Sequence, residues 1–248
     1  VTAVGADVSR YKVGDKVGVG CMVDSCRQCE ACNADLEQYC LEGPTQTYAS
    51  KDRVDGSITM GGYSDSIVVS ERFVVRIPEK LDLASAAPIL CAGITTYSPL
   101  KHYNVKPGDK VGILGMGGLG HMGIKFAKAM GAEVTLFTRS EAKAEEGRRQ
   151  GADHVIVSTD AKQMAAAAGH FDFLLDTIPV QHDLNPYLQT LRFDGVHILV
   201  GLVEPVEPPV HSANLVTKRR VLAGSMIGGM AETQEVLDFC AEHGITCD

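Results

Sequence analysis

The stretch "KVGILGMGGLGHMGIKFAKAMG", residues 110–131, decides the fold of this chain. Its opening letters form an apolar run that predicts a buried strand. The letters around and after the glycines place Leu119, Met122 and Phe126 at helical spacing, which predicts a helix with one buried face. A strand that passes through a tight turn into a helix is the first half of a βαβ unit.

The turn itself carries the pattern Gly115-x-Gly117-x-x-Gly120, with Gly118 and Leu119 inside it. Gly115 permits the sharp bend, Gly117 lets the backbone approach a pyrophosphate, and Gly120 lets the helix pack closely on the strand. The amino end of the helix favours negative phosphates. Directly after a strand, this pattern predicts a dinucleotide site. The alternative is a glycine-rich turn without a ligand.

The end of the next strand, "EVTLFT", indicates which dinucleotide binds. Sites for NAD usually present an acid there, which accepts the ribose 2′-hydroxyl. This chain has Thr138, Arg139 and Ser140, a hydroxyl–guanidinium–hydroxyl set that suits a 2′-phosphate. We therefore expect NADP. The alternative is that Glu141 accepts the ribose and Arg139 is only solvated.

The rest of the chain changes its pattern near residues 92–100. Before this point, "KVGDKVGV", "YSDSIVVS" and "FVVRIP" are short segments rich in Val and Ile, and they predict a small β domain. After it, apolar runs alternate with helical segments, among them the charged "SEAKAEEGRRQG" that Gly151 closes. This alternation predicts an α/β fold, a Rossmann doubly wound parallel sheet covered on both faces.

The composition narrows the class of protein. The chain has 248 residues, of which 45% are hydrophobic and 22% charged, as is ordinary for a globular protein. A formal net charge of −8 argues against a nucleic-acid partner, since such proteins carry basic surfaces. No run of about 18 apolar residues is present, so we expect no transmembrane helix and no membrane partner. The chain opens without Met and in what reads as the middle of a strand, so we expect a fragment of a longer protein.

Four of the eight cysteines lie in "CRQCEACNADLEQYC", residues 26–40. In a reducing cytoplasm, clustered thiols are more often metal ligands than disulfides. Four thiolates close a tetrahedral Zn²⁺ shell and leave no open position, so the predicted site is structural. The alternatives are an iron–sulfur cluster, disulfides and incidental free thiols, although ferredoxin patterns place the last cysteine closer and before a proline. The predicted zinc ligands are Cys26, Cys29, Cys32 and Cys40.

The four-cysteine lobe, "CAGITTYSPL" and the glycine turn together resemble the zinc-dependent medium-chain alcohol dehydrogenases. Within that family, the NADP-dependent cinnamyl alcohol dehydrogenase group and the bacterial broad-range aldehyde reductases are the most similar, and "GGYSD", "AAPILCAGITTYSPL" and "AGSMIGG" look like pieces of that group. The resemblance covers the whole chain. It implies a partial GroES-like catalytic domain with the zinc lobe over residues 1–96, a Rossmann NADP-binding domain over 97–232, and the start of a return segment to the catalytic domain over 233–248.

The resemblance also implies a second, catalytic zinc, which the family holds with Cys, His and Cys and a nearby Glu. Cys91 in "LCAG" matches the last of these ligands. The other ligands are expected upstream of Val1, and the close of the catalytic domain after Asp248, so this chain alone is expected to hold only the structural zinc. The alternative is that Cys91 is a small buried residue at a hinge. Cys21 is expected to be structural or incidental.

Further cofactor contacts are implied by the same resemblance. Thr95 would lie near the nicotinamide, and Lys143 would join the residues after the second strand at the 2′-phosphate and ribose. Five residues at later strand ends would line the rest of the cofactor groove: Thr177, Gly201, Ser225, Met226 and Ile227. The alternative for these five is ordinary packing at strand ends.

The function implied by the resemblance is hydride transfer between NADPH and an aldehyde, with the reverse reaction from a primary alcohol to NADP. The catalytic zinc would act as a Lewis acid on the substrate oxygen. The expected partners are a small-molecule aldehyde or alcohol and a second copy of the chain, in a cytoplasmic homodimer. Two alternatives stay open: a zinc-free quinone or enal reductase of the same superfamily, and a zinc-stapled NADP-binding sensor module.

Overall fold

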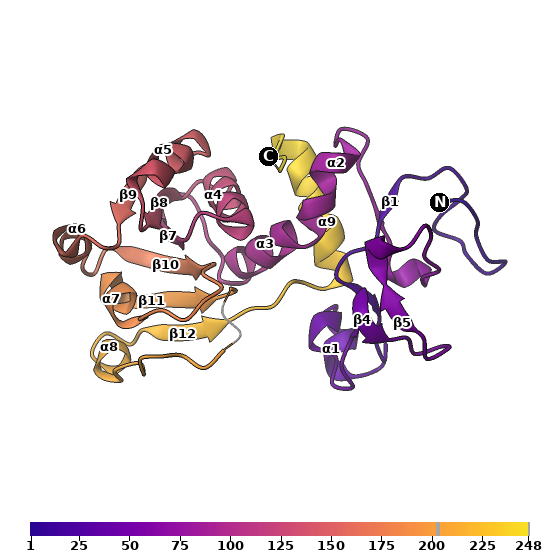
Figure 1. The fold of residues 1–248 in the computed structure, drawn as a ribbon, viewed down its shortest axis with the longest axis horizontal. Helices are drawn as coiled ribbons and strands as arrows, with labels where there is room; N and C mark the ends of the chain where they lie inside the picture. Colours follow the sequence, from indigo (N-terminus) through magenta and orange to yellow (C-terminus); the bar gives the residue numbers. More distant parts are fainter. Residues whose placement is uncertain (202–203, 248) are drawn as a thin grey trace. The chain divides into compact units, whose positions relative to one another are not determined.

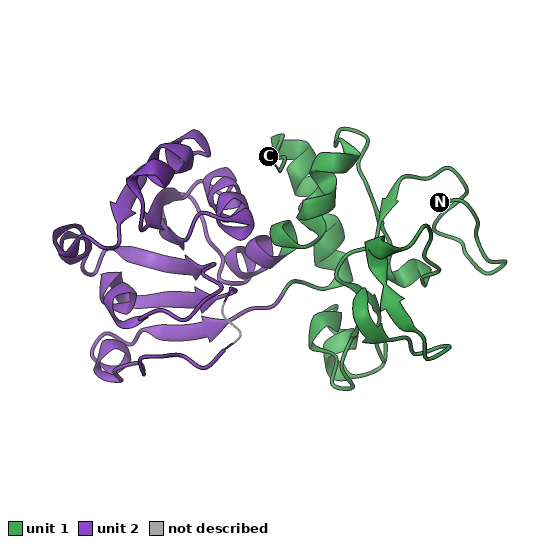
Figure 2. Cartoon of the chain, in the orientation of Figure 1, with its two compact units in different colours: residues 1–94, 227–248 green, residues 95–226 purple. Residues whose placement is uncertain are grey.

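The computed structural model describes residues 1–201 and 204–247 and shows two compact units (Figures 1 and 2). One unit contains Val1–Ile94 and Ile227–Asp248, and the other contains Thr95–Met226. The expected domain ranges 97–232 and 233–248 include Leu202, Val203 and Asp248, which lie outside the described residues.

A six-stranded parallel sheet forms the centre of the unit Thr95–Met226. The strand order in space is β12-β11-β10-β7-β8-β9, so the chain starts in the middle and runs outward twice. This is the doubly wound order, and it confirms the predicted α/β sheet. The order reverses between β7 and β10, where such sheets bind their ligands beyond the carboxyl ends of the strands. The strands are β7 (Lys110–Leu114), β8 (Glu133–Thr138), β9 (His154–Val157), β10 (Phe171–Asp176), β11 (Leu191–Leu199) and β12 (Val221–Gly224).

Helices alternate with these strands, as the sequence predicts. The helix after the glycine turn buries Met122 and Phe126, which lie on one face at the expected spacing. The charged helix ends before Gly151, which has φ +106°, a left-handed conformation that does not continue a helix. The helices are α3 (Ala92–His102), which begins in the other unit, α4 (Gly118–Ala129), α5 (Glu141–Arg149), α6 (Ala161–Ala166), α7 (Asn185–Thr190) and α8 (Ala213–Val216).

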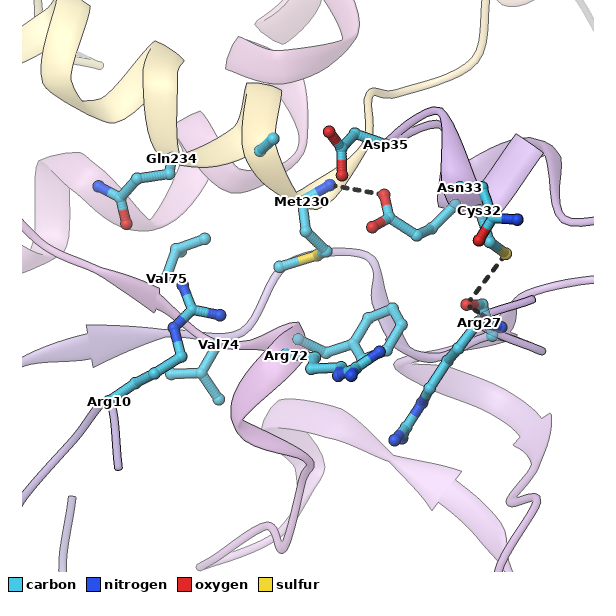
Figure 3. A pocket seen from close by; sticks show the side chains of 14 residues that line it. Arg10, Arg27, Cys32, Asn33, Asp35, Arg72, Val74, Val75, Met230 and Gln234 are labelled. Atoms are coloured by element: carbon cyan, nitrogen blue, oxygen red, sulfur yellow. Dashed lines mark hydrogen bonds between the residues drawn. The ribbon is translucent and has the colours of Figure 1, made fainter. Parts of the chain in front are cut away.

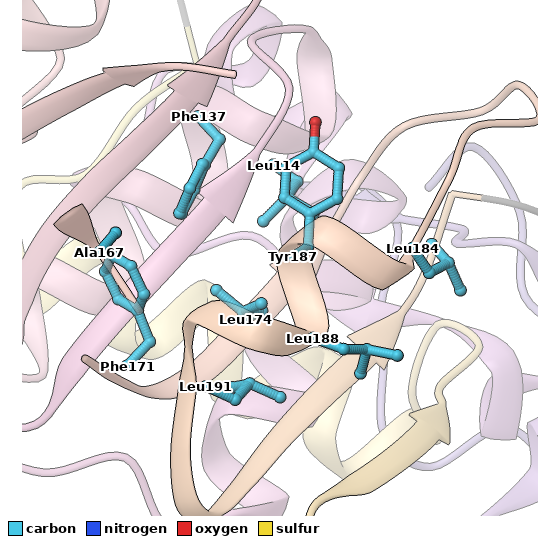
Figure 4. Packing of buried hydrophobic residues seen from close by; sticks show 9 residues of the cluster. All are labelled: Leu114, Phe137, Ala167, Phe171, Leu174, Leu184, Tyr187, Leu188 and Leu191. Carbon is cyan, nitrogen blue, oxygen red and sulfur yellow. The ribbon is translucent and has the colours of Figure 1, made fainter. Parts of the chain in front are cut away.

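Aromatic and leucine side chains fill the space between the sheet and α7 (Figure 4). The ring of Phe137 on β8 meets the rings of Phe171 and Tyr187 edge-on, with centroids 5.2 Å and 5.6 Å away. Leu114, the last residue of β7, is fully buried in the same cluster. This packing fixes the carboxyl end of β7, from which the glycine turn starts.

The other unit is built from short antiparallel pairs, β1 with β6, β2 with β3 and β4 with β5. The predicted strands in "KVGDKVGV" and "FVVRIP" are confirmed as β1 and β6, which pair with each other. The strands are β1 (Val17–Gly18), β2 (Met22–Asp24), β3 (Thr45–Gln46), β4 (Tyr48–Lys51), β5 (Ile58–Met60) and β6 (Val75–Arg76). The helices are α1 (Glu30–Asn33), η1 (Glu37–Tyr39), η2 (Gly61–Tyr63), η3 (Glu71–Phe73), α2 (Leu83–Ala86), η4 (Ala87–Leu90) and α9 (Met230–His243).

The third predicted segment, "YSDSIVVS", is not a strand, and that prediction is wrong. Residues 63–70 contain no strand, and Val68 is fully exposed. A β segment is stabilised by its hydrogen-bonded neighbour, and no described residue pairs with this one. A composition rich in Val and Ile is therefore not enough to make this segment a strand.

Within the described part of the chain, no single helix is long and apolar enough to cross a membrane, and one bent pair, Leu83–Leu90 with Ala92–His102, meets the requirement by length and composition only.

Candidate cofactor and metal sites

The glycine turn connects β7 to α4 at the carboxyl end of the central strands, where the strand order reverses. Gly115 has φ +92°, a conformation that residues with side chains rarely adopt. A Cβ atom at Gly120 would lie 2.1 Å from the carbonyl oxygen of Gly115, so only glycine fits at that position. Together these two glycines let α4 begin directly against the end of β7.

The same turn leaves an open cradle at the amino end of α4. A Cβ atom at Gly117 or Gly118 would meet no heavy atom within 4 Å beyond its chain neighbours. In the described structure no side chain caps α4, so the N–H groups of its first turn can bind a ligand. Leu119 follows and is half-buried. An open cradle of N–H groups at a helix amino end suits a pyrophosphate, so these residues fit the expected NADP.

The residues after β8 lie at the same carboxyl end of the sheet, because β8 is parallel to β7. Thr138 is buried, and its Oγ1 accepts a hydrogen bond from the N–H of Ser140 at 3.3 Å. Arg139 is exposed. The Nζ atom of Lys143 donates to the carbonyl oxygen of Met116 in the glycine turn, at 3.4 Å. The structure therefore brings Lys143 to the glycine turn and leaves the guanidinium of Arg139 accessible at the end of β8.

Thr177 and Gly201 follow the neighbouring strands β10 and β11. The Oγ1 atom of Thr177 donates to the carbonyl oxygen of Leu114 at 2.7 Å, directly before the glycine turn. A Cβ atom at Gly201 would lie 2.6 Å from the carbonyl carbon of Thr177. These two expected cofactor residues therefore pack against each other and against the start of the turn.

The four remaining expected cofactor residues lie after β12, on α3 and in the other unit. Ser225 and Met226 follow β12, the edge strand, and Met226 is 44% exposed. Thr95 is buried on α3. Ile227 belongs to the other unit and has φ +40°. Their roles at the cofactor stay a prediction.

Four cysteines converge in the loop between β2 and β3. The Sγ atoms of Cys26, Cys29, Cys32 and Cys40 all lie within 4.8 Å of one another. The Sγ atoms of Cys26 and Cys32 are 3.8 Å apart. A tetrahedral zinc with thiolate bonds of about 2.3 Å requires sulfur–sulfur distances of about 3.8 Å. The set therefore fits a closed, structural zinc shell.

Backbone N–H groups point at these sulfurs. The N–H of Cys29 donates to Cys26 Sγ at 3.3 Å, that of Cys26 to Cys40 Sγ at 3.4 Å, and that of Leu41 to Cys29 Sγ at 3.4 Å. Donors from Cys32 and Leu41 lower the pKa of Cys29 to about 6, whereas burial raises the pKa of Cys32 to about 11. A bound Zn²⁺ would keep both as thiolates, and the N–H groups would orient them.

Cys91 follows η4 and is exposed, so it is not a fully buried hinge residue. Cys21 shares a hydrogen bond with it, which lowers the pKa of Cys91 to about 6 and raises the pKa of Cys21. The Sγ atom of Cys21 also lies 3.5 Å from the carbonyl oxygen of Leu90. This pair could not be predicted from the sequence, because the two cysteines are far apart along the chain.

A polar cavity of about 400 Å³ lies beside the cysteine lobe (Figure 3). The carboxylate of Glu37 accepts the N–H of Met230 there, at 3.0 Å, and so caps α9. Ser25 Oγ and Cys32 Sγ are 3.3 Å apart at its edge. Charged side chains of both signs line it: Arg10, Arg27, Arg72, Asp35 and Glu37. None of the expected cofactor residues is part of this cavity.

Comparison with known families agrees with this geometry. The family described as zinc-binding dehydrogenase matches residues 118–242, and the alcohol dehydrogenase GroES-like domain matches residues 1–79. The fold and the two sites thus define a dehydrogenase of the zinc-binding class, and the expected GroES-like part is confirmed.

Similar proteins narrow this class. The chain is 54% identical over 247 residues to NADP-dependent alcohol dehydrogenase C 1 of Mycolicibacterium smegmatis, covering 99% of this chain and 70% of that protein. It is 53% identical over 249 residues to aldehyde reductase YahK of Escherichia coli, covering 100% and 71%. A cinnamyl alcohol dehydrogenase structure from Sorghum bicolor superposes with a TM-score of 0.95 at 45% identity, covering 100% of this chain and 70% of that one. The chain therefore belongs to the zinc-binding alcohol dehydrogenase family.

Proposed function

We propose that the protein containing this chain reduces aldehydes to primary alcohols with NADPH, and oxidises the alcohols with NADP in the reverse direction. The observation that carries the proposal is the end of β8, where the accessible Arg139 stands between two hydroxyl residues in place of an acid. The relatives named above as NADP-dependent alcohol dehydrogenase and aldehyde reductase support it. This chain covers 70% and 71% of those two proteins, so the proposal concerns the full-length protein.

The residues of the unit Thr95–Met226 bind and orient the cofactor. The N–H groups at Gly117 and Gly118 bind the pyrophosphate. Arg139 and Lys143 bind the 2′-phosphate by charge and hydrogen bonds. NADPH supplies the hydride, and the protein supplies its position.

Different cysteines of the unit that contains Val1–Ile94 bind the structural zinc and the catalytic zinc. Cys26, Cys29, Cys32 and Cys40 hold a structural zinc, and Cys91 is one ligand of the catalytic zinc. When bound, the catalytic zinc polarises the carbonyl oxygen of the aldehyde. The thiol of Cys21 lies against Cys91 and donates to its sulfur, which favours the thiolate that a metal requires.

The expected domain roles are part of this proposal: residues 1–96 as the GroES-like catalytic part, 97–232 as the NADP-binding domain and 233–248 as a return segment. A homodimer is also proposed, on the family resemblance. A reducing, cytoplasmic location is proposed because four of the cysteines lie together in a set that fits a metal site.

The experiment that tests the proposal compares NADPH with NADH in aldehyde reduction by the full-length protein. The wild type should prefer NADPH, and Arg139→Asp should weaken NADPH and favour NADH, since a carboxylate repels the 2′-phosphate and accepts the ribose hydroxyl. Arg148→Asp is the matched control, because Arg148 is an exposed arginine on α5 that forms a surface ion pair with Glu145. Equal kinetics with both cofactors in the wild type would contradict the proposed role of Arg139.

A further inference from the structure

A buried carboxylate lies next to the glycine turn. Asp176 ends β10 and is fully buried. Its Oδ2 atom accepts hydrogen bonds from the Nε2 atoms of His182 and His197, each at 2.9 Å. Its Oδ1 atom accepts the N–H of Ile178 at 3.1 Å. The two histidines come from β11 and from the segment before α7, so the fold alone brings the three ionisable groups together.

The hydrogen-bond partners of His182 determine its charge. Its Nδ1 atom lies 2.8 Å from the carbonyl oxygen of Val180, which can only accept. Its Nε2 atom faces the carboxylate of Asp176, which also accepts. Both ring nitrogens therefore carry a proton, and His182 is an imidazolium. Burial acts to lower the pKa of His182, but the bonds to Asp176 and Val180 outweigh it and raise that pKa.

His197 is neutral, in contrast to His182. Its Nε2–H donates to Asp176, whereas its Nδ1 is buried and has no hydrogen-bond partner among the described residues. A second proton on Nδ1 would be a buried donor without an acceptor, so His197 is neutral. The cluster thus holds one carboxylate and one imidazolium, and its charges balance. Burial acts to raise the pKa of Asp176, but the bonds from both histidines lower it.

The segment between β10 and α7, residues 177–183, is held at both ends. At its start, Thr177 donates to the carbonyl oxygen of Leu114 with its N–H at 3.1 Å and with its Oγ1 at 2.7 Å. Near its end, His182 binds Asp176 and the carbonyl oxygen of Val180. Leu114 directly precedes Gly115, so the position of this segment and that of the glycine turn are coupled.

We propose that His182 is a positioning residue for the cofactor: as an imidazolium it holds segment 177–183 against the glycine turn, and the affinity for NADP(H) falls when it loses its proton. The proposal rests on the proposed function, because it concerns the same cofactor site. It does not require His182 to touch the cofactor.

The neighbours of His182 support the charged form. Asp176 faces it from β10, and Asp183 adds negative charge from its own segment. From α7, the ring of Tyr187 meets the imidazole edge-on, with centroids 5.9 Å apart, and burial raises the pKa of Tyr187, so it stays neutral. From β11, His197 is neutral and lies across Asp176. No cation is therefore among these neighbours to oppose the proton on His182.

The test is the dissociation constant of NADPH, measured by fluorescence titration from about pH 6 to about pH 9, where an imidazole loses its proton. His182→Gln keeps a donor toward Asp176 but removes the charge. We expect this variant to bind NADPH about tenfold more weakly than the wild type at the acid end, and equally at the alkaline end. Groups on NADPH titrate in both proteins and cancel in the ratio. His154→Gln is the matched control, because His154 is exposed at the amino end of β9, and it should follow the wild type throughout.

If the ratio of the two dissociation constants, His182→Gln over wild type, stays constant over the whole pH range, the proposal is overturned, since a merely structural role does not depend on the charge of His182. A wild type that does not bind NADPH at all would instead contradict the proposed function itself. If His182→Gln does not fold, imidazole NMR of the wild type decides. Because linkage is reciprocal, bound NADPH must raise the pKa of His182. An unchanged pKa would overturn the proposal.

Discussion

A methyl group added at Gly120 would lie 2.1 Å from the carbonyl oxygen of Gly115, whereas one added at Gly117 would meet no heavy atom within 4 Å beyond its chain neighbours. At the scale of single residues, the two glycines therefore serve different needs. Gly120→Ala should lower the free energy of unfolding by about 1–3 kcal/mol, because the clash involves backbone that cannot move away. Gly117→Ala should leave the free energy of unfolding nearly unchanged and weaken NADPH binding at least about tenfold, because the methyl group enters the pyrophosphate cradle.

Urea unfolding and NADPH titration of the two variants check this contrast. Gly118→Ala is the control for stability, since a Cβ atom there also meets open space and alanine favours the first turn of α4. A Gly117→Ala variant that binds NADPH as tightly as the wild type would show that the cradle is not the pyrophosphate site.

Cys91 carries the proposed catalytic metal. Cys91→Ser in the full-length protein should reduce the zinc content from two ions per chain to one and abolish aldehyde reduction, while NADPH still binds. Cys247→Ser is the control, because this cysteine lies near the end of the chain and away from both clusters in the sequence. Metal analysis and steady-state kinetics give the result. A Cys91→Ser protein that keeps both zinc ions and its turnover would remove Cys91 from the mechanism.

At the scale of elements, the cysteine lobe between β2 and β3 depends on its metal. The flanking elements are short, so the free energy of zinc binding is a large part of the lobe's folding free energy. Cys32→Ser removes the most buried of the first three ligands and should release the zinc and unfold residues 21–47. Hydrogen exchange should show fast exchange there and unchanged protection in the sheet of the unit Thr95–Met226. Retained zinc in this variant, or iron and sulfide in the wild type, would contradict the structural zinc site.

The sequence predicted those elements whose signal is local. The glycine turn is recognisable because Gly115, Gly117 and Gly120 are close in sequence and each answers a steric need at its own position. The four cysteines are recognisable for the same reason, since a metal shell closed within one loop fixes their spacing. The alternation of strands and helices after residue 101 predicted the parallel sheet because its central strands β7, β8 and β10 are buried on both faces and therefore appear as apolar runs.

Elements and contacts that depend on distant residues could not be predicted in this way. "YSDSIVVS" has the composition of a strand, but pairing is set by a partner elsewhere in the chain. Asp176, His182 and His197 meet only because β10 and β11 lie side by side. An acidic residue that ends an apolar strand was the one available signal for that cluster. The contact between Cys21 and Cys91 left no signal of comparable kind.

At the scale of the whole molecule, the metal ligands and the cofactor residues belong to different units of the chain. The unit Val1–Ile94 with Ile227–Asp248 holds the five predicted zinc ligands, and the unit Thr95–Met226 holds the glycine turn and Arg139. The relatives described above are longer than this chain, which covers 70% and 71% of them. Hydride transfer to an aldehyde is therefore a claim about the full-length protein.

The measurement that tests this claim most directly follows the hydride itself. Full-length protein is given NADPH deuterated at the transferred position of the nicotinamide, together with cinnamaldehyde, which has both a carbonyl group and a conjugated carbon–carbon double bond. The expected product is cinnamyl alcohol with deuterium on the carbon that carries the hydroxyl group, because a polarised carbonyl accepts the hydride there. Deuterium at the far carbon of the double bond, with the aldehyde intact, would instead identify a zinc-free enal reductase. Either that product or the absence of any deuterium transfer would contradict hydride transfer to the carbonyl group.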